Sequence, residues 1–398
     1  MVKPEIKCYL SEANNYSLNR VCILQQGADL KKQARKDQSV CNPMKENILV
    51  RRPGDLTVSW AQKIVNIHSN AIKVSRIDIV SIDIGTTTRI RLNIEHNGPE
   101  TLPRRWFVKL PSRAWRARVI TSLSRLLHIE VRFYKEIAPS VPVTRPVILA
   151  AQSKFGRGTT LVLMDVTELG ARPGCSSDAL TVAQAALVIK QLADFHAHFW
   201  NTSRDPKYRW LAGPVRRLED NLGSALAAPL MKRGLQRAGS LIPGSLHAPA
   251  MHYARHRRLA MRSLSDGPQT LVHHDCHPGN LFWTLSRPGF LDWQLVRIGE
   301  GISDIAYFLA TALDPETRRL HEASFIASYF HILEDNGVAG IDFKNLLLRY
   351  RAHLVYPLEA MLMTLAIGGM MDSESNLELI RRTAAAVEDH DAFSVLPI

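Results

Sequence analysis

The stretch Leu271-Val-His-His-Asp-Cys-His-Pro-Gly-Asn-Leu-Phe-Trp283, followed by Gly289-Phe-Leu-Asp-Trp-Gln294, places a dense group of polar residues between short apolar runs. Apolar runs of this length predict strands, and the polar residues between them predict a loop. The loop contains His273-x-Asp275-x-x-x-x-Asn280, and Asp292 follows the apolar pair Phe290-Leu291. We therefore expect a packed hairpin to hold three oxygen-bearing side chains rigidly on one side.

This spacing is typical of a kinase-type phosphoryl-transfer site. Magnesium is a hard cation that prefers oxygen ligands, so Asn280 and Asp292 are the predicted metal ligands. Asp275 is the predicted catalytic residue, because a carboxylate that is not a tight metal ligand can orient an acceptor hydroxyl and take its proton. His273 is predicted to brace the catalytic loop.

Earlier in the chain, two alternating runs predict a β-hairpin with Gly85 and Thr86 at its turn. Kinases cover the nucleotide phosphates with such a turn, although a single glycine is a weak signal and a plain strand turn is the alternative. The next predicted strand carries Lys109 after Phe107-Val108, and Glu130 lies in the following amphipathic helix. A lysine in this position pairs with nucleotide phosphates and with a helix glutamate in kinases.

A further apolar, β-branched strand is predicted over residues 159–166. In the kinase arrangement it leads into the hinge, where backbone groups near Met164 and Val166 would hold the adenine. Asp165, between them, is open to a simpler interpretation as a polar residue that ends the strand.

The three motifs His-His-Asp-Cys-His-Pro-Gly-Asn-Leu-Phe-Trp, Phe-Leu-Asp-Trp-Gln and Gly301-Ile-Ser-Asp304-Ile-Ala-Tyr-Phe-Leu resemble the aminoglycoside phosphotransferase/choline kinase superfamily, and within it the ecdysteroid-kinase-like (CHK kinase-like) branch. The resemblance covers roughly residues 53 to 370. It implies that Asp304 supports the catalytic loop, whereas the residues alone favour a helix N-cap. The family usually has a small residue, often Gly, where this chain has His274; if that position needs a positive φ, His occupies it at some cost.

The resemblance implies a bilobal, protein-kinase-like α+β fold. We expect a poorly ordered N-terminal extension over residues 1–52, a small β-rich N-lobe over 53–165 and a larger, mostly helical C-lobe over 166–398. Residues 181–200 predict a helix capped by Asp178 or Thr181. The C-terminal helices are expected to surround the acceptor, with Tyr350, Tyr356 and Glu359 as candidates for its pocket.

The composition of the 398-residue chain, with 46% hydrophobic residues, is that of a globular protein, and the formal net charge is +13. No nucleic-acid motif accompanies this charge, so we expect a solvated basic surface and no nucleic-acid partner. The five cysteines are scattered, which argues against a disulfide framework. Neither a signal peptide nor a transmembrane run is evident, and a cytoplasmic location follows by default. The oligomeric state is not predicted.

The predicted function is an ATP-dependent phosphotransferase, with GTP as the alternative donor, that uses Mg²⁺ and acts on a small-molecule alcohol. Three other hypotheses stay open. His273, His274, Cys276 and His277 could bind zinc, although neighbouring residues point apart. A protein kinase would need an activation segment, for which only 12 residues separate Asp292 from Asp304. A catalytically impaired, nucleotide-binding regulatory protein would bind nucleotide without turnover.

Overall fold

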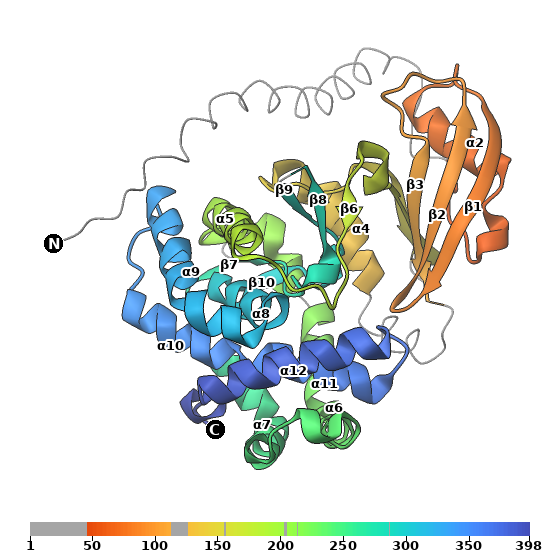
Figure 1. Ribbon diagram of the computed structural model, residues 1–398. Coiled ribbons are helices and arrows are strands. Elements are labelled where there is room, and N and C mark those ends of the chain that lie inside the picture. Colours follow the sequence, from red (N-terminus) through yellow and green to blue (C-terminus); the bar gives the residue numbers. More distant parts are fainter. Residues whose placement is uncertain (1–45, 113–125, 155–156, 203–204, 213, 286) are drawn as a thin grey trace.

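The computed structural model describes residues 46–112, 126–154, 157–202, 205–212, 214–285 and 287–398. A small lobe built on a β-sheet lies on one side of the molecule, and a larger helical lobe lies on the other (Figure 1). The predicted bilobal kinase-like fold is confirmed. The described helices do not include any that combines the length and apolarity needed to span a membrane.

The small lobe contains a five-stranded antiparallel sheet with the strand order β1-β2-β3-β5-β4. Its strands, in chain order, are β1 Val74–Ile84, β2 Thr87–His96, β3 Arg105–Pro111, β4 Ile148–Lys154 and β5 Gly158–Met164. The β1–β2 turn falls at Gly85 and Thr86, as the alternation predicted. A side chain at Gly85 would press on the Met370 carbonyl and the Arg89 guanidinium, which explains why the turn has a residue without one.

Helix α2 (Val58–His68) packs on one face of the sheet. The Thr57 side chain accepts a hydrogen bond from Trp60 N and so caps the first turn of this helix. On β2 every second side chain from Ile90 to Ile94 is buried against this helix, because successive side chains of a strand point to opposite faces. The alternation of apolar residues in the sequence therefore corresponds to the alternation of buried side chains on β2.

The segment before residue 53 also contributes to this core. Ile48 and Val50 are buried, and Val50 N donates to Thr160 Oγ1 on β5 at 3.1 Å. The sheet core thus begins before the predicted boundary at residue 53. Most of the predicted N-terminal extension, residues 1–45, lies outside the described residues.

The opposite face of the sheet receives helix α4 (Leu126–Glu136), which carries Glu130. Because β2 and β3 pair with Arg89 opposite Lys109, these two cations share that face. After β5, Asp165 caps a short 3-10 turn, η4 (Val166–Leu169), by accepting from Thr167 N at 2.9 Å. Asp165 therefore ends the strand, as its simpler interpretation proposed.

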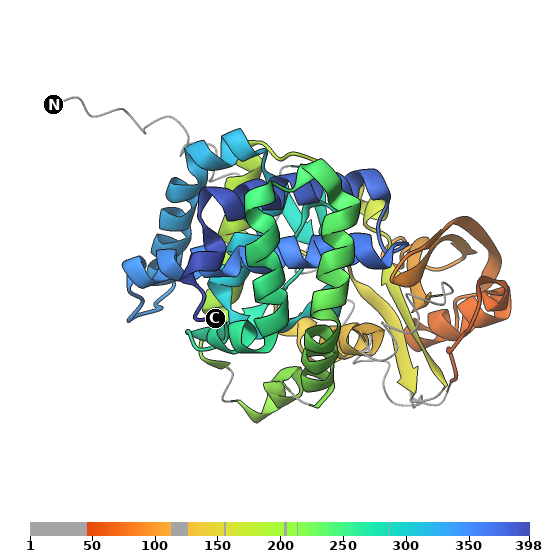
Figure 2. The same ribbon diagram turned by 90° about the horizontal axis from the view of Figure 1, so that it is seen from below.

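The larger lobe is mostly helical. Its long helices are α5 Val182–His198, α6 Pro214–Ala238, α7 Gly244–Ser263, α8 Gly301–Ala312, α9 Pro315–Asp335, α10 Phe343–His353, α11 Val355–Ile367 and α12 Ser373–Asp389. Helix α8 is buried on all sides and forms the centre of this lobe. Helices α6 and α7 lie side by side on the underside of the lobe (Figure 2), where α6 also packs against α11.

Helix α5 begins at Thr181, one of the two predicted caps. The Thr181 side chain accepts from Gln184 N, and the Gln184 side chain accepts from Thr181 N, which makes a capping box. Near the other end, His196 is a core residue with two polar partners, as expected for a satisfied buried histidine. Helix α5 thus extends from its cap at Thr181 to His196, whose ring contacts Asp304.

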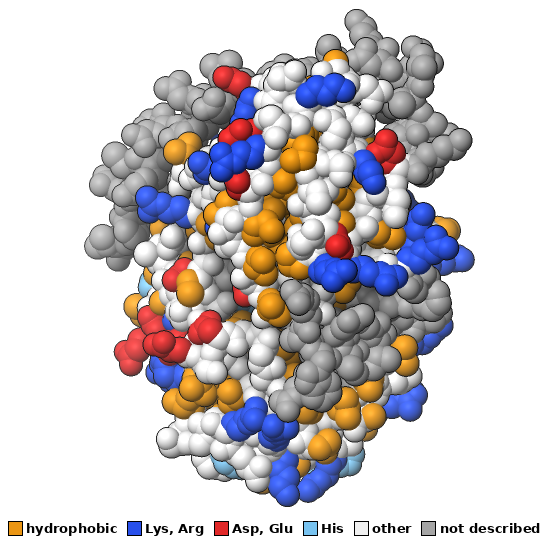
Figure 3. All heavy atoms as spheres, turned by 90° about the vertical axis from the view of Figure 1, so that its right-hand side faces the viewer, with side chains coloured by type: hydrophobic (Ala, Val, Ile, Leu, Met, Phe, Trp, Pro, Cys, Tyr) orange, Lys and Arg blue, Asp and Glu red, His pale blue; other side chains and the backbone are white. Residues whose placement is uncertain are grey.

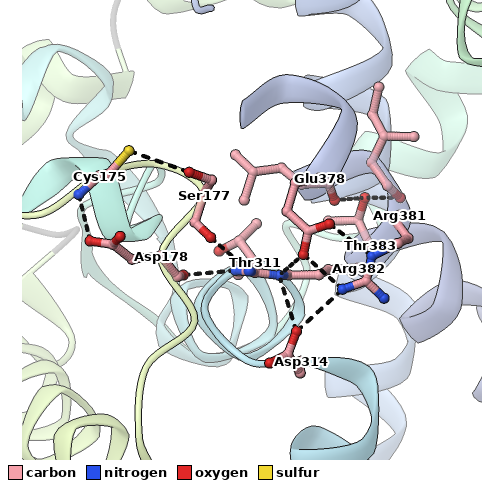
Figure 4. A network of polar contacts seen from close by, with 11 residues as sticks. Cys175, Ser177, Asp178, Thr311, Asp314, Glu378, Arg381, Arg382 and Thr383 are labelled. Atoms are coloured by element: carbon pink, nitrogen blue, oxygen red, sulfur yellow. Dashed lines mark hydrogen bonds and ion pairs between the residues drawn. The ribbon is translucent and has the colours of Figure 1, made fainter. Parts of the chain in front are cut away.

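Arg382 on α12 ties three segments of the larger lobe together (Figure 4). Its guanidinium donates to the carbonyls of Ser177, Asp178 and Thr311 at 2.7–2.9 Å and to Glu378 Oε1 at 2.7 Å. The Ser177 segment in turn pairs with the strand after the catalytic loop, through a bond from Gly174 N to Leu281 O of 2.9 Å. A helix near the C-terminus therefore supports the loop that carries Asp275.

Replacing Arg382 with Met is expected to lower the free energy of unfolding by about 3 kcal/mol, because buried carbonyl acceptors are left without a donor. Arg381→Met is the matched control. The Arg381 side chain is 41% exposed and its ion pairs with Glu378 and Asp314 are screened by solvent, so we expect a loss below about 1 kcal/mol. Urea denaturation of both variants measures the difference. Equal losses would show that Arg382 contributes no more than a surface arginine.

Candidate active site

The loop from His273 to Asn280 connects two short strands of the larger lobe. Strand β7 (Gln269–Val272) precedes it and pairs with β10 (Arg297–Glu300), and β8 (Leu281–Thr284) follows it and pairs with β9 (Arg287–Phe290). Leu281 lies opposite Phe290, and Leu291 N donates to Asn280 O at 2.8 Å. Asn280 and Asp292 therefore flank the same end of one hairpin, which is the arrangement the sequence predicted.

The carboxylate of Asp304 binds the backbone of the loop. Its carboxylate accepts hydrogen bonds from His273 N at 2.6 Å and His274 N at 2.8 Å, and it lies 3.2 Å from His196 Nε2. Asp304 lies within the first turn of α8, whose N-cap is Glu300. The interpretation of Asp304 as an N-cap was wrong, and the role implied by the family resemblance, support of the catalytic loop, agrees with these contacts.

His273 links the loop to the segment before Asp292. Its Nε2 donates to Leu291 O at 2.8 Å, and its Nδ1 accepts from Asp275 N at 3.3 Å. Burial lowers the pKa of His273, so the ring stays neutral in this tautomer. A neutral histidine that joins Asp275 to Leu291 fixes the position of the loop relative to the hairpin.

His274 has a φ of 69°, in the left-handed region that glycine adopts most easily. Position 274 therefore does adopt a positive φ, and His occupies a position where the family usually has a small residue. The imidazole stacks on Tyr356, with ring centroids 4.2 Å apart, and the Arg297 guanidinium lies 3.5 Å from its Nε2. These contacts offset part of the backbone cost of a non-glycine residue at this position.

Comparing His274→Gly with His274→Ala separates the backbone cost from the ring contacts, since both variants lose the imidazole. The glycine variant is expected to be more stable than the alanine variant by about 1 kcal/mol, because a Cβ is disfavoured at positive φ. Urea denaturation of the two proteins measures this difference. If alanine is as stable as glycine, the loop does not require a left-handed residue at position 274.

Asp275 is held by two donors. Tyr307 OH donates to its Oδ1 at 2.7 Å, and Asn280 Nδ2 donates to its Oδ2 at 2.9 Å. Burial raises the pKa of Asp275 to about 7, while the hydrogen bond from Tyr307 acts in the opposite direction. The carboxylate is thus fixed in one rotamer and has the basicity suited to accepting a proton near neutral pH.

Lys109 joins the two lobes at the site. Its ammonium donates to both oxygens of Glu130 at 2.8 and 2.9 Å and forms an ion pair with Asp292 Oδ1 at 3.0 Å. Burial opposes the charged form, but the carboxylates of Asp292 and Glu130 outweigh it and raise the pKa of Lys109. Glu130 Oε1 also accepts from Trp293 N at 3.3 Å, so α4 contacts the residue directly after Asp292.

The donor set at Asn280 and Asp292 fits magnesium. Asn280 uses its amide nitrogen to bind Asp275, which leaves its oxygen as a ligand. Among the residues that the structure describes, none donates a hydrogen bond to Asp292 Oδ2, so this carboxylate keeps one oxygen for a cation. Two oxygen ligands from a carboxylate and an amide, completed by water and phosphate, suit magnesium better than a softer metal.

The four residues considered for zinc have separate partners. His273 bonds to Leu291 O, Cys276 Sγ to Asp304 O at 3.2 Å, and His277 Nδ1 accepts from Gly279 N at 3.1 Å, while His274 stacks on Tyr356. Within the described ranges there is no group of three or more His, Cys, Asp or Glu side chains that could hold a metal ion. The geometry gives no support to the zinc hypothesis.

The remaining predicted residues lie at the edges of this arrangement. Gly85 and Thr86 form the β1–β2 turn, and Gly85 O accepts from Ser112 Oγ at 2.7 Å at the end of β3. Met164 ends β5, and Val166 begins η4, where both backbones are held by pairing with neighbouring segments. The β1–β2 turn and the predicted hinge residues Met164 and Val166 therefore lie at opposite ends of β3, the strand that carries Lys109.

Two residues at the site were missed by sequence reasoning. Tyr307 binds Asp275, and its signal is its place one helical turn after Asp304 on α8, since residues three apart share a face. Arg89 lies opposite Lys109, and its signal is the strand register, which alternation alone does not give. Its guanidinium forms an ion pair with Asp83 at 2.6 Å, while its Nε is buried without a hydrogen-bond partner.

Several residues of the C-terminal helices proved structural. Arg257 is buried and paired with Glu359, which also accepts from Tyr253 OH at 2.8 Å. Tyr350 is buried and donates to Glu322 at 3.1 Å. Of the three pocket candidates, Tyr356 alone is only partly buried, and it lies against the loop at His274.

Comparison with known proteins identifies the family of this chain. The family model described as "Phosphotransferase enzyme family" matches residues 94–338, and the chain therefore belongs to the phosphotransferase enzyme family. The match spans β3, α4, the catalytic loop and Asp304. The predicted superfamily and the predicted phosphotransferase class are confirmed. A comparison with curated protein sequences gave no match.

Solved structures of similar proteins include small-molecule kinases. A choline kinase from Cryptosporidium parvum has 13% identity, covers 85% of this chain and 97% of its own, and gives a TM-score of 0.47. An ethanolamine kinase from Plasmodium vivax has 14% identity, with coverage of 79% and 81% and a TM-score of 0.43. An aminoglycoside phosphotransferase in complex with GDP and kanamycin has 13% identity, with coverage of 83% and 98% and a TM-score of 0.46.

Proposed function

We propose that this phosphotransferase transfers the γ-phosphate of ATP to the hydroxyl group of a small-molecule alcohol. The observation that carries the proposal is the assembly of Lys109, Glu130 and Asp292 beside the loop of Asp275 and Asn280. Phosphoryl transfer depends mainly on positioning and charge neutralisation, and these residue types supply both. The small lobe, residues 46–165, would hold the nucleotide, and residues 166–398 would hold the acceptor.

On the nucleotide side, Lys109, aligned by Glu130, would bind the phosphates, and the turn at Gly85 and Thr86 would cover them. Arg89 would add a second cation, because it lies opposite Lys109 and its Nε has no hydrogen-bond partner. Backbone groups at Met164 and Val166 would hold the adenine. GTP is the alternative donor, with guanine bound in the same place. Comparing Mg-ATP with Mg-GTP in the binding experiment distinguishes the two nucleotides.

Magnesium would be held by the free oxygens of Asn280 and Asp292, where it would neutralise charge on the phosphates. On the acceptor side, Asp275 would orient the alcohol and accept its proton, and Tyr307 and His273 would keep that carboxylate in place. The partly buried ring of Tyr356, stacked on His274, would contact the acceptor.

Thermal melting with Mg-ATP and Mg-GTP tests the nucleotide site. A ligand that binds only the folded state stabilises it by about 2.7 kcal/mol at a concentration of 100 Kd. We expect the nucleotide to raise the melting temperature of the wild type and to have little effect on Asp292→Ala, which removes a ligand oxygen of the metal. No rise with either nucleotide would contradict the proposal.

A screen of alcohols for ADP release then separates an active enzyme from a nucleotide-binding regulatory protein. The active enzyme is expected to release ADP faster with a subset of alcohols than with water alone. Binding of nucleotide without acceptor-dependent ADP release over a broad screen would favour the regulatory alternative.

A further inference from the structure

The outer edge of the small lobe carries a row of exposed apolar side chains on β1. Ile79, Val80, Ile82 and Ile84 are 44–57% exposed, and they are four of the sixteen large hydrophobic residues that are exposed among the described ones. Figure 3 shows a band of hydrophobic side chains running along this side of the molecule, with charged side chains beside it. No other strand of the described sheet has a comparable row.

Strand β1 is also an edge strand, because the order β1-β2-β3-β5-β4 leaves it with β2 as its one partner in the sheet. It is 11 residues long. An edge strand exposes a row of unpaired N–H and C=O groups, and a long apolar one favours pairing with another chain. Proteins usually place charges or proline on such edges, and on β1 the charged residues Arg76, Asp78 and Asp83 alternate with isoleucines that are exposed on the other face.

A β-bulge gives the row its geometry. The register with β2 shifts between Ile79 and Ser81, so Val80 is the additional residue. Ile77 and Ile79 before the bulge, and Ile82 and Ile84 after it, lie opposite Ile94, Leu92, Ile90 and Thr88, whose side chains all point to the α2 face. The bulge therefore keeps four isoleucines on one face of the strand, which simple alternation would not do.

This pattern is complementary to itself. If a second copy of β1 runs antiparallel with Ile79 opposite Ile82, then Ile77 falls opposite Ile84, and the two-fold axis repeats both pairs. Cross-strand pairs of β-branched residues contribute about 0.2–1 kcal/mol each. The same register places polar residues opposite polar residues on the other face, so no isoleucine meets a charge.

The charges on the other face are balanced. Arg76 pairs with Asp78 at 3.0 Å, and Arg89 on β2 pairs with Asp83 at 2.6 Å. In the antiparallel register Arg76 lies diagonally beside Asp83 of the second copy. The register also places Asp78 opposite Asp83 of the second copy, and the arginine partners of these two aspartates offset the repulsion between their carboxylates.

We propose that β1 is an interface between two copies of this chain, which pair antiparallel about a two-fold axis and join their sheets into one of ten strands. A two-fold interface uses the same patch on both copies, so it needs the self-complementary pattern that β1 shows. The proposal does not rest on the proposed phosphotransferase function, although the turn at Gly85 and Thr86, which continues β1, is also part of the proposed nucleotide site.

Sedimentation velocity of the full chain over a range of concentrations tests the proposal. We expect a species with twice the mass of the chain that dissociates on dilution. Ile79→Lys combined with Ile82→Lys is expected to give a monomer with unchanged thermal stability, since both side chains are half-exposed in the folded chain. The matched control is Leu259→Lys with Leu348→Lys, two residues of similar exposure on α7 and α10, which should remain dimeric.

Disulfide cross-linking tests the register without relying on the lysine variant. Asp78→Cys with Asp83→Cys should form a bond between copies, identified by mass spectrometry of the linked peptides, because these positions lie opposite each other. Asp78→Cys alone is the comparison, because in this register Asp78 lies opposite Asp83 and not opposite Asp78 of the second copy. Three results would each overturn the proposal. They are a monomeric wild type, a dimer that persists in the Ile79→Lys, Ile82→Lys variant, and disulfide links that form only in the comparison variant. A monomer would indicate that another partner covers β1.

Discussion

The variant Asp275→Asn is expected to lower kcat by about 10²–10⁴-fold, the contribution typical of a general base. Asparagine keeps the size of the side chain and can still bind Tyr307 and Asn280, but it cannot accept the proton of the acceptor hydroxyl. Nucleotide binding should be unchanged, because Lys109 and Asp292 remain. ADP release with a responsive alcohol measures kcat, and the thermal shift with Mg-ATP measures binding.

The stability of this variant separates loss of chemistry from loss of structure. Burial raises the pKa of Asp275 to about 7, which shows that the folded protein disfavours its charge. Removing that charge should therefore leave the melting temperature unchanged or slightly higher. Tyr307→Phe, which removes one donor to Asp275, should lower kcat by about tenfold without changing the KM for nucleotide. Full activity of Asp275→Asn would exclude Asp275 as the base.

The variant Lys109→Met is expected to lower the free energy of unfolding by about 3–5 kcal/mol, because it leaves Glu130 and Asp292 as neighbouring buried carboxylates without a cation. Lys109 is 3% exposed and Glu130 is fully buried, so water does not replace the lost partner. Loss of the phosphate contact should abolish nucleotide binding in the same variant. Urea denaturation and the thermal shift with Mg-ATP measure the two effects.

Adding Glu130→Gln to Lys109→Met tests the electrostatic explanation. The double variant removes one of the two unpaired charges, and we expect it to recover about half of the lost stability while nucleotide binding stays absent. Glu130→Gln alone keeps Lys109 paired with Asp292 and should cost less than Lys109→Met. If the double variant is no more stable than Lys109→Met, the loss comes from packing and not from unpaired charge.

Much of the fold could be predicted from local patterns. Alternation of apolar residues predicted the β1–β2 hairpin and its turn at Gly85, and Thr181 marked a helix start that the structure confirms. These features depend on residues within a few positions of one another, where side-chain direction follows from the backbone. The boundary at residue 53 was less certain, because burial of Ile48 depends on a sheet that is completed a hundred residues later.

The candidate site likewise contains residues that local patterns predicted and residues that they did not. The loop from His273 to Asn280 and the position of Asp292 could be recognised because short spacings within one hairpin fix their geometry. Tyr307, Arg89 and Arg382 could not, because their contacts join residues 20 to more than 200 positions apart. The interpretation of Asp304 failed for a related reason, since a carboxylate at a helix start looks like a cap until the loop beside it is known.

The sequence by itself therefore determined the class of chemistry, the order of the two lobes and the residues of the catalytic loop, since local spacing and alternation encode them. The tertiary structure alone decided three further contacts: Tyr307 with Asp275, Arg89 opposite Lys109, and Arg382 with the segment behind the loop. It also decided that the isoleucines of β1 share one exposed face, because a bulge changes their alternation. Such contacts depend on how distant segments pack together, and no local pattern specifies that packing.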